Sequence, residues 1–152
     1  MNLTSLLKVE NVNLDLKSRK KQDVLRELVM MIREGETAEM LLQTLLKREE
    51  LGSTGIGKGI AIPHGRSLLL DKLEIAIGRS TKGVDFDAID NKPVYLFFLV
   101  MAPPQDPSNQ YLIALGRIAM VAQELTKRKQ SFVPQTSHEF IELVRTIEEK
   151  LR

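Results

Sequence analysis

The chain of 152 residues contains no cysteine and no tryptophan, and only two of its residues are histidine. The absence of cysteine excludes disulfide bonds, thiolate metal sites and cysteine nucleophiles. An excess of one charge is also lacking, because 22 Lys and Arg residues against 20 Asp and Glu residues leave a net charge of +2. Such a small charge, without a basic stripe that carries aromatic residues, predicts no nucleic-acid partner.

Long hydrophobic runs are missing as well. No stretch approaches 18 uninterrupted apolar residues, so the sequence predicts no membrane insertion. The N-terminal segment contains Glu10 and Asp15 and lacks the basic start and apolar run of a signal peptide. We therefore expect a cytoplasmic protein that folds as a single domain over residues 1–152.

Two amphipathic helices are predicted before the middle of the chain. Apolar side chains recur at helical spacing from Val24 to Ile32, and Gly35 is expected to end this helix. Thr37 is expected to cap the second helix, which carries Arg48 toward its end. A dense basic run within residues 17–21 is expected to be solvated.

Short β-prone runs follow, and two further helices end the chain. The run 94–101 is apolar throughout, as expected of a strand buried on both faces. The order of elements predicts an α/β fold, with a mixed β-sheet flanked by helices. The remaining strands are predicted at 60–62 and 74–78. The third helix is expected to be capped by Ser108 or Asn109 and the fourth by Thr136 or Ser137. The third helix should carry basic residues near its end, namely Lys127, Arg128 and Lys129.

The segment 52–65, GSTGIGKGIAIPHG, holds five of the nine glycines and partly matches a phosphate-binding P-loop. Residues 52–58 fit that motif, but Gly59 stands where Ser or Thr is needed to hold Mg²⁺. A P-loop also opens a helix, in which Pro63 and Gly65 are unfavourable. A nucleotide-binding enzyme is therefore a weak alternative, although closely spaced glycines still let backbone N–H groups converge on an anion.

Metal and hydrolase sites find little support in the pattern. His64 and His138 are far apart in the sequence and form no HExxH or HxH motif, and His138 is expected at the surface near a helix start. Ser53 lies in no G-x-S-x-G nucleophile elbow. The sequence therefore predicts neither a bound metal nor a cofactor.

His64 is the candidate for chemistry. Pro63 and Gly65 favour a rigidly placed His64 at the end of a strand, with a backbone-bonded turn residue as the alternative. A neutral imidazole is a competent nucleophile and can carry a covalent intermediate. If the electrophile is phosphorus, the side chains of Arg48, Ser53 and Thr54 and the amides of the glycine loop supply donors for the phosphoryl oxygens.

Residues 48–65, REELGSTGIGKGIAIPHG, resemble the active-site signature of fructose/mannitol-type IIA domains of the phosphoenolpyruvate-dependent sugar phosphotransferase system. Residues 86–94, FDAIDNKPV, resemble the next segment of that family, and the resemblance covers the chain in element order. It implies the mannitol-type IIA fold, with helices on both faces of the sheet. It further implies that His64 accepts a phosphoryl group from a histidine-phosphorylated carrier protein, and that Arg48, Ser53 and Thr54 frame the phosphohistidine. Gly55 and Gly57 are expected to shape the anion-binding loop.

The chain departs from this family at one position. Transport members carry a second histidine in an H-L-x-x-L segment after the last strand, where this chain has Tyr111. A tyrosine can still donate a hydrogen bond to a phosphoryl oxygen, but it cannot become a cation at neutral pH.

The signature in a chain of one domain is similar to the nitrogen-regulatory branch, whose members signal through phosphorylation-dependent contacts. The implied partners are a histidine phosphocarrier protein (HPr or nitrogen-type HPr) and regulatory target proteins or a IIB domain. Such a chain is a covalently modified component of the system rather than a classical turnover enzyme. Two alternatives stay open: a discrete IIA subunit of a sugar transporter, and an interaction module of the same fold that is not phosphorylated.

Overall fold

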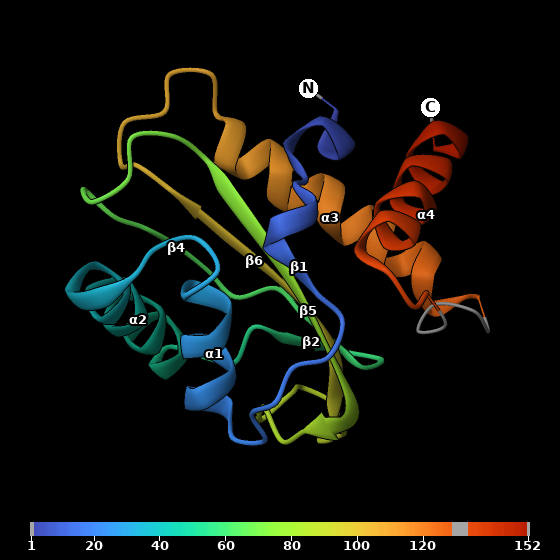
Figure 1. Cartoon of the computed structure of the whole chain (residues 1–152), viewed down its shortest axis with the longest axis horizontal. Helices are drawn as coiled ribbons and strands as arrows, with labels where there is room; N and C mark the ends of the chain where they lie inside the picture. Colours follow the sequence, from blue (N-terminus) through green and yellow to red (C-terminus); the bar gives the residue numbers. More distant parts are fainter. Residues whose placement is uncertain (1, 129–133, 152) are drawn as a thin grey trace.

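The computed structural model describes residues 2–128 and 134–151. In this part of the chain, six strands form one mixed sheet with helices on both faces, which confirms the predicted fold class (Figure 1). The elements are η1 (Leu3–Leu6), η2 (Val9–Asn11), β1 (Val12–Asn13), α1 (Lys21–Val29), α2 (Gly35–Glu50), β2 (Gly55–Gly57), β3 (Ile60–Ala61), β4 (His64–Arg66), β5 (Glu74–Val84), β6 (Val94–Ala102), α3 (Gln110–Thr126) and α4 (Ser137–Lys150). Within the described ranges, no helix is long and apolar enough to cross a membrane.

Strand β6 organises the sheet. It pairs antiparallel with β5 on one side and parallel with both β3 and β4 on the other. Ala61 of β3 is paired with Phe97, and His64 of β4 with Val100, so both strands keep the same register on β6. They are therefore two halves of one strand, interrupted only at residues 62–63. β1 beside β5 and β2 beside β3 complete the sheet.

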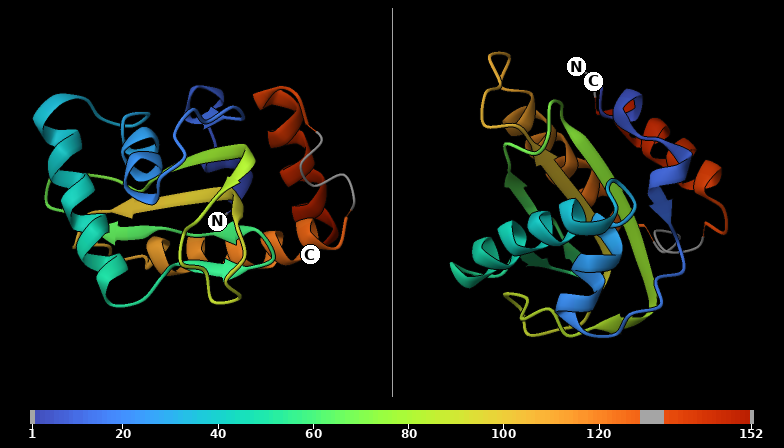
Figure 2. Two further views of the ribbon diagram at one scale, coloured as in Figure 1. Left: turned by 90° about the horizontal axis from the view of Figure 1, so that it is seen from below. Right: turned by 60° about the vertical axis from the view of Figure 1, so that its left-hand side comes forward.

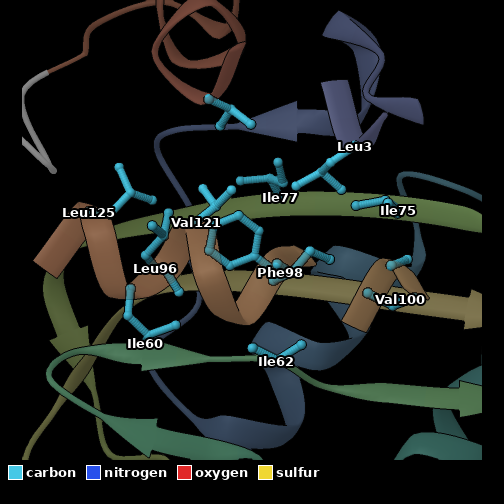
Figure 3. Packing of buried hydrophobic residues seen from close by; sticks show 14 of the residues in the cluster. Leu3, Ile60, Ile62, Ile75, Ile77, Leu96, Phe98, Val100, Val121 and Leu125 are labelled. Atoms are coloured by element: carbon cyan, nitrogen blue, oxygen red, sulfur yellow. The ribbon is translucent and has the colours of Figure 1, made fainter. Parts of the chain in front are cut away.

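Each face of the sheet buries its own hydrophobic core. Helices α3 and α4 cover one face and α1 and α2 the other (Figure 2). On the first face, Ile77 and Phe98 lie beside Val121 of α3 (Figure 3). Phe97 and Leu99, which precede and follow Phe98 in β6, point into the second core. This alternation explains why β6 is apolar at every position.

The boundary between the first two helices differs from the prediction. α1 ends at Val29, and turns follow from Met30 to Ile32. Gly35 does not end this helix: it is the first residue of α2, with a φ of +61° that favours glycine. Thr37 consequently lies inside α2 and does not cap it.

The caps of the last two helices agree with the prediction in part. Asn109 occupies the N-cap position of α3 but makes no capping hydrogen bond with its side chain. The Asp106 carboxylate accepts from the Tyr111 N–H instead, at 2.8 Å. Thr136 caps α4 as predicted, accepting from the Glu139 N–H at 3.1 Å. Of the three basic residues expected near the end of the third helix, Lys129 lies outside the described residues.

Candidate functional site

His64 lies where the interrupted strand resumes as β4. Its backbone is paired with Val100 of β6, and the Val100 N–H donates to the Pro63 carbonyl at 3.0 Å. The imidazole is half-buried, and its Nδ1 lies 2.8 Å from the carbonyl oxygen of Ile62. The ring is therefore tied to the strand that carries it, in an extended segment rather than a turn.

This contact decides which ring nitrogen carries the hydrogen. A carbonyl oxygen only accepts hydrogen bonds, so Nδ1 of His64 must be the donor. In the neutral ring, Nε2 then keeps its lone pair. Nε2 is consequently the ring atom that can attack an electrophile.

Tyr111, in the first turn of α3, lies beside His64. The two ring centroids are 6.1 Å apart, and the ring planes are inclined at 59°. Burial raises the pKa of the Tyr111 hydroxyl, although the positive charges of Arg66 and Arg48 act in the opposite direction. The hydroxyl is therefore protonated at neutral pH and can donate a hydrogen bond toward the site.

Two guanidinium groups belong to this site. Arg48, near the end of α2, donates from Nη1 to the Gly52 carbonyl at 2.8 Å. Arg66 follows His64 by two residues on β4, a spacing that places both side chains on one face of the strand. The Cζ atom of Arg66 lies 4.3 Å from the centroid of the Tyr111 ring. The motif pointed to Arg48 but missed Arg66, for which the two-residue spacing was the available signal.

The glycine loop forms a hairpin and not a P-loop. β2 pairs antiparallel with β3, and the chain turns into β3 at Lys58 rather than opening a helix. The Lys58 N–H donates to the Asp90 carboxylate at 2.9 Å, and the Gly55 N–H to Ser53 Oγ at 3.0 Å. Gly57 has a φ of +96°, which the turn of the hairpin requires. The structural context of a nucleotide-binding loop is therefore missing.

Ser53 and Thr54 use their hydroxyl hydrogens inside the protein. Ser53 Oγ donates to the Phe86 carbonyl at 2.7 Å. Thr54 Oγ1 donates to the Glu49 carboxylate at 2.5 Å. The structure thus brings His64, Tyr111 and Arg66 together through their side chains, whereas the two hydroxyls hold the loop beside them.

A buried carboxylate connects this loop to the histidine. Glu49 accepts from the Thr54 N–H at 3.1 Å and forms an ion pair with Lys21 Nζ at 2.9 Å, with only 5% of its side chain exposed. The Thr54 carbonyl accepts from the N–H of Ile62, whose own carbonyl holds the His64 ring. No sequence pattern pointed to this role of Glu49, and the expectation that Lys21 belongs to a solvated run is wrong.

Within residues 2–128 and 134–151, no group of three or more His, Asp or Glu side chains could hold a metal ion. His138 is exposed in the first turn of α4, as expected.

The comparison with known families decides the identity of the domain. A family model described as "Phosphoenolpyruvate-dependent sugar phosphotransferase system, EIIA 2" matches residues 5–147. The chain belongs to this family. It is 31% identical over 147 residues to the "PTS system fructose-specific EIIABC component" of Bacillus subtilis. The matched region covers 95% of this chain and 23% of that relative. It is 36% identical over 126 residues to the "Nitrogen regulatory protein" of Bradyrhizobium diazoefficiens, which covers 82% of each chain.

Solved structures of EIIA domains share the fold. The "Nitrogen Regulatory Protein IIA-Ntr" of Neisseria meningitidis has a TM-score of 0.75 at 26% identity, covering 93% of this chain and 98% of the other. Mannitol IIA of Escherichia coli, solved in complex with phosphorylated IIB, has a TM-score of 0.71 at 18% identity over 92% and 97% of the chains, a likeness of fold alone. The resemblance inferred from residues 48–65 and the mannitol-type IIA fold are thereby confirmed.

Proposed function

We propose that this EIIA chain is a phosphotransfer protein that accepts a phosphoryl group on His64 from a histidine-phosphorylated carrier protein, HPr or a nitrogen-type HPr. Its phosphorylation state then regulates partner proteins, in line with the name of the nitrogen-regulatory relative. The hydrogen bond from Nδ1 to the Ile62 carbonyl carries the proposal, because it leaves Nε2 free as a nucleophile. We also propose that residues 1–152 form one EIIA domain and that the protein is cytoplasmic, as expected from the sequence.

The transfer exchanges one phosphorus–nitrogen bond for another. The Nε2 lone pair of His64 forms a bond to phosphorus while the bond from phosphorus to the donor's ring nitrogen breaks. The electron pair of the broken bond returns to the donor ring. The His64 ring gains positive character, and the Ile62 carbonyl that accepts from Nδ1 stabilises it.

The remaining residues of the site hold the group and its loop. Arg48 and Tyr111 are proposed to donate to phosphoryl oxygens, the first as a cation and the second as a neutral hydroxyl. The loop beside them consists of Ser53, Thr54, Gly55 and Gly57. Because the two hydroxyl hydrogens are donated within the protein, these residues contribute by fixing the shape of the loop.

Phosphorylation by a phosphorylated carrier protein tests the proposal. The purified chain should gain one acid-labile, base-stable phosphate, as expected of a phosphohistidine. His64→Ala should abolish the label, whereas His138→Ala, which changes the exposed second histidine, should keep it. A label retained in His64→Ala would refute the site, and an unlabelled wild type would refute the function.

A discrete IIA subunit of a fructose/mannitol-type transporter is the second candidate. The 31% identity to a fructose-specific relative supports it. In this case a IIB domain should remove the phosphoryl group from His64. If the phosphoryl group stays on His64 in the presence of IIB domains, the result supports the regulatory role.

An interaction module that is not phosphorylated is the third candidate, and Tyr111 in place of a histidine supports it. This candidate predicts an unlabelled wild-type chain and a partner that binds wild type and His64→Ala equally well. A partner that distinguishes the labelled from the unlabelled chain would contradict it.

A further inference from the structure

The replacement of a second histidine by Tyr111 removes a potential cation from the site, since a buried phenol stays neutral. A phosphoryl group brings up to two negative charges, and charged donors bind such oxygens more strongly than neutral ones. The guanidinium of Arg66 lies over the ring of this same tyrosine. We propose that Arg66 is a second phosphoryl-binding cation of the site, positioned by the Tyr111 ring. This inference rests on the proposed phosphorylation of His64.

The contacts of Arg66 orient its donors. Nη1 donates to the carbonyls of Pro103 at 3.1 Å and Pro104 at 3.4 Å, just beyond the end of β6. The guanidinium also lies 4.3 Å from the ring centroid of Tyr111. A guanidinium has five N–H donors, and the contacts in the described part of the chain use Nη1 alone. Nε and Nη2 are therefore available for a phosphoryl group.

Arg48, which lies on α2 rather than on β4, is anchored in a similar way. It is anchored through Nη1 to the Gly52 carbonyl and leaves its other nitrogens available. Both arginines act electrostatically on the Tyr111 hydroxyl, so their charges converge on one region beside His64. In the described residues, neither arginine forms an ion pair with an acidic side chain, whereas Arg26 and Arg145 do. Two cations near Tyr111, neither with an acidic partner in the described residues, fit a doubly charged anion on the adjacent His64.

This arrangement divides the task of one histidine between two residues. Tyr111 supplies a flat ring and a hydroxyl, and Arg66 supplies the positive charge. In general a guanidinium group stays charged across the physiological pH range, whereas an imidazolium does not. The charge on the phosphoryl-binding side of this site is thus expected to be independent of pH near neutrality.

The test uses phosphoramidate as a small phosphoryl donor for the full chain, so that docking of a carrier protein does not enter. The rate of His64 phosphorylation is followed by ³¹P NMR. Arg66→Gln should slow it by about tenfold to a hundredfold, the range expected when one charged donor is lost. Arg66→Lys keeps the charge without the planar fork and should fall in between. Arg145→Gln, an exposed arginine of α4, is the matched control and should react like wild type.

A second readout separates binding from a structural role. The pH at which the doubly charged phosphoryl group on His64 takes up one proton and becomes singly charged is read from the ³¹P shift. Loss of a nearby cation raises this pH, so Arg66→Gln should titrate at a higher pH than wild type and Arg66→Lys close to it. Tyr111→Phe keeps the ring under Arg66 but loses the hydroxyl donor, so its titration should shift less than that of Arg66→Gln. Tyr111→Leu also removes the support of Arg66 and should shift at least as far as Arg66→Gln.

Phosphorylation of Arg66→Gln within twofold of wild type, with an unchanged titration, would overturn the inference if Arg48→Gln is slowed in the same assay. If Arg66→Gln does not fold, Tyr111→Leu decides, because a wild-type rate and an unshifted titration in that variant overturn the positioning of Arg66 by the ring. A wild-type chain that takes no phosphoryl group at all overturns the proposed function together with this inference. The two failures can be told apart, because wild type and all variants stay unlabelled in this case, whereas wild type is labelled when only the role of Arg66 fails.

Discussion

At the scale of single residues, one backbone carbonyl sets the chemistry of His64. The Ile62 N–H is bonded to Thr54, and the Pro63 carbonyl to Val100. In the described residues no backbone N–H donates to the Ile62 carbonyl, which accepts from the imidazole instead. A neighbouring strand at this point would take that carbonyl, and the two tautomers of the ring would compete.

The hydrogen on Nδ1 of His64 can be observed directly. In ¹⁵N NMR spectra of the neutral, unphosphorylated chain, Nδ1 of His64 should carry the hydrogen and Nε2 should not, because a carbonyl can only accept. The exposed His138 provides the internal reference for an unconstrained ring. A hydrogen on Nε2 of His64 would contradict the geometry on which the proposed function rests.

At the scale of elements, the end of α2 supports the site in two directions. Arg48 reaches the Gly52 carbonyl, whereas Glu49 next to it reaches Thr54 and Lys21. Helix α2 also packs directly on β4, because a Cβ atom on Gly65 would lie 3.2 Å from Thr44 Cγ2. One helix thereby fixes the loop, the strand and a phosphoryl-binding arginine together.

Removal of the Glu49 charge tests this support. Glu49→Gln removes the closer of two acidic partners of Lys21, leaving Asp87 at 3.9 Å, and weakens the hydrogen bonds to Thr54. The free energy of unfolding should therefore fall by about 2 kcal/mol. Urea unfolding measures the change. Thr54→Ser retains the hydroxyl and serves as the control, which should lose far less. Equal stability of Glu49→Gln and wild type would show that the ion pair contributes nothing net.

Periodicity and motif predicted much of these elements but not their long-range partners. The strand at β6 and the helix after Thr136 were predicted because their signals are local. β4 was not predicted as a strand, because its three residues are extended through pairing with β6. Gly35 was misassigned because a glycine with positive φ serves a helix start as well as a helix end.

The site residues likewise fall into those that a local motif indicates and those that only long-range contacts define. His64 and Arg48 were recognisable because they belong to one contiguous motif. Arg66 depends on stacking against Tyr111, and Lys21 on an ion pair with Glu49, both across long stretches of chain. The spacing from His64 indicates only the strand face of Arg66, whereas the stacking and the ion pair follow from the packing of separate elements and leave no signal in a single sequence.

At the scale of the whole molecule, Glu148 of α4 fastens the N-terminal segment over the core between α3 and α4. Its carboxylate accepts from the N–H groups of Leu3 and Thr4 and from the Thr4 hydroxyl. Burial alone would raise the pKa of this carboxyl. The hydrogen bonds, together with the charge of Arg117 at 3.7 Å, outweigh it and hold the pKa below its ordinary value.

A dependence of stability on pH follows from that lowered pKa. The unfolded chain takes up the proton at the ordinary value near 4.5, and the folded chain only at lower pH. Between the two values the unfolded state binds more protons, so the stabilisation by Glu148 is complete above this window and is lost as the pH falls through the folded pKa.

Denaturant unfolding across this acid range tests the expectation, with Glu148→Gln as the comparison. The variant should be less stable at neutral pH and should lose less stability on acidification. Other carboxyls with lowered pKa values, Asp15 and Asp90, titrate in both proteins and cancel in the difference. Parallel curves for the two proteins would assign the acid sensitivity to other groups.

The common register of β3 and β4 on β6 has a consequence for how other proteins can sense this site. The backbone beneath His64 is paired with Val100, which is buried in one core, while the next pair places Met101 in the other. The chain under the ring therefore has little freedom to change its course. A phosphoryl group on this ring would alter the surface potential and leave the shape almost unchanged. A protein that reads the two states must then read charge, and its discrimination should weaken as ionic strength rises.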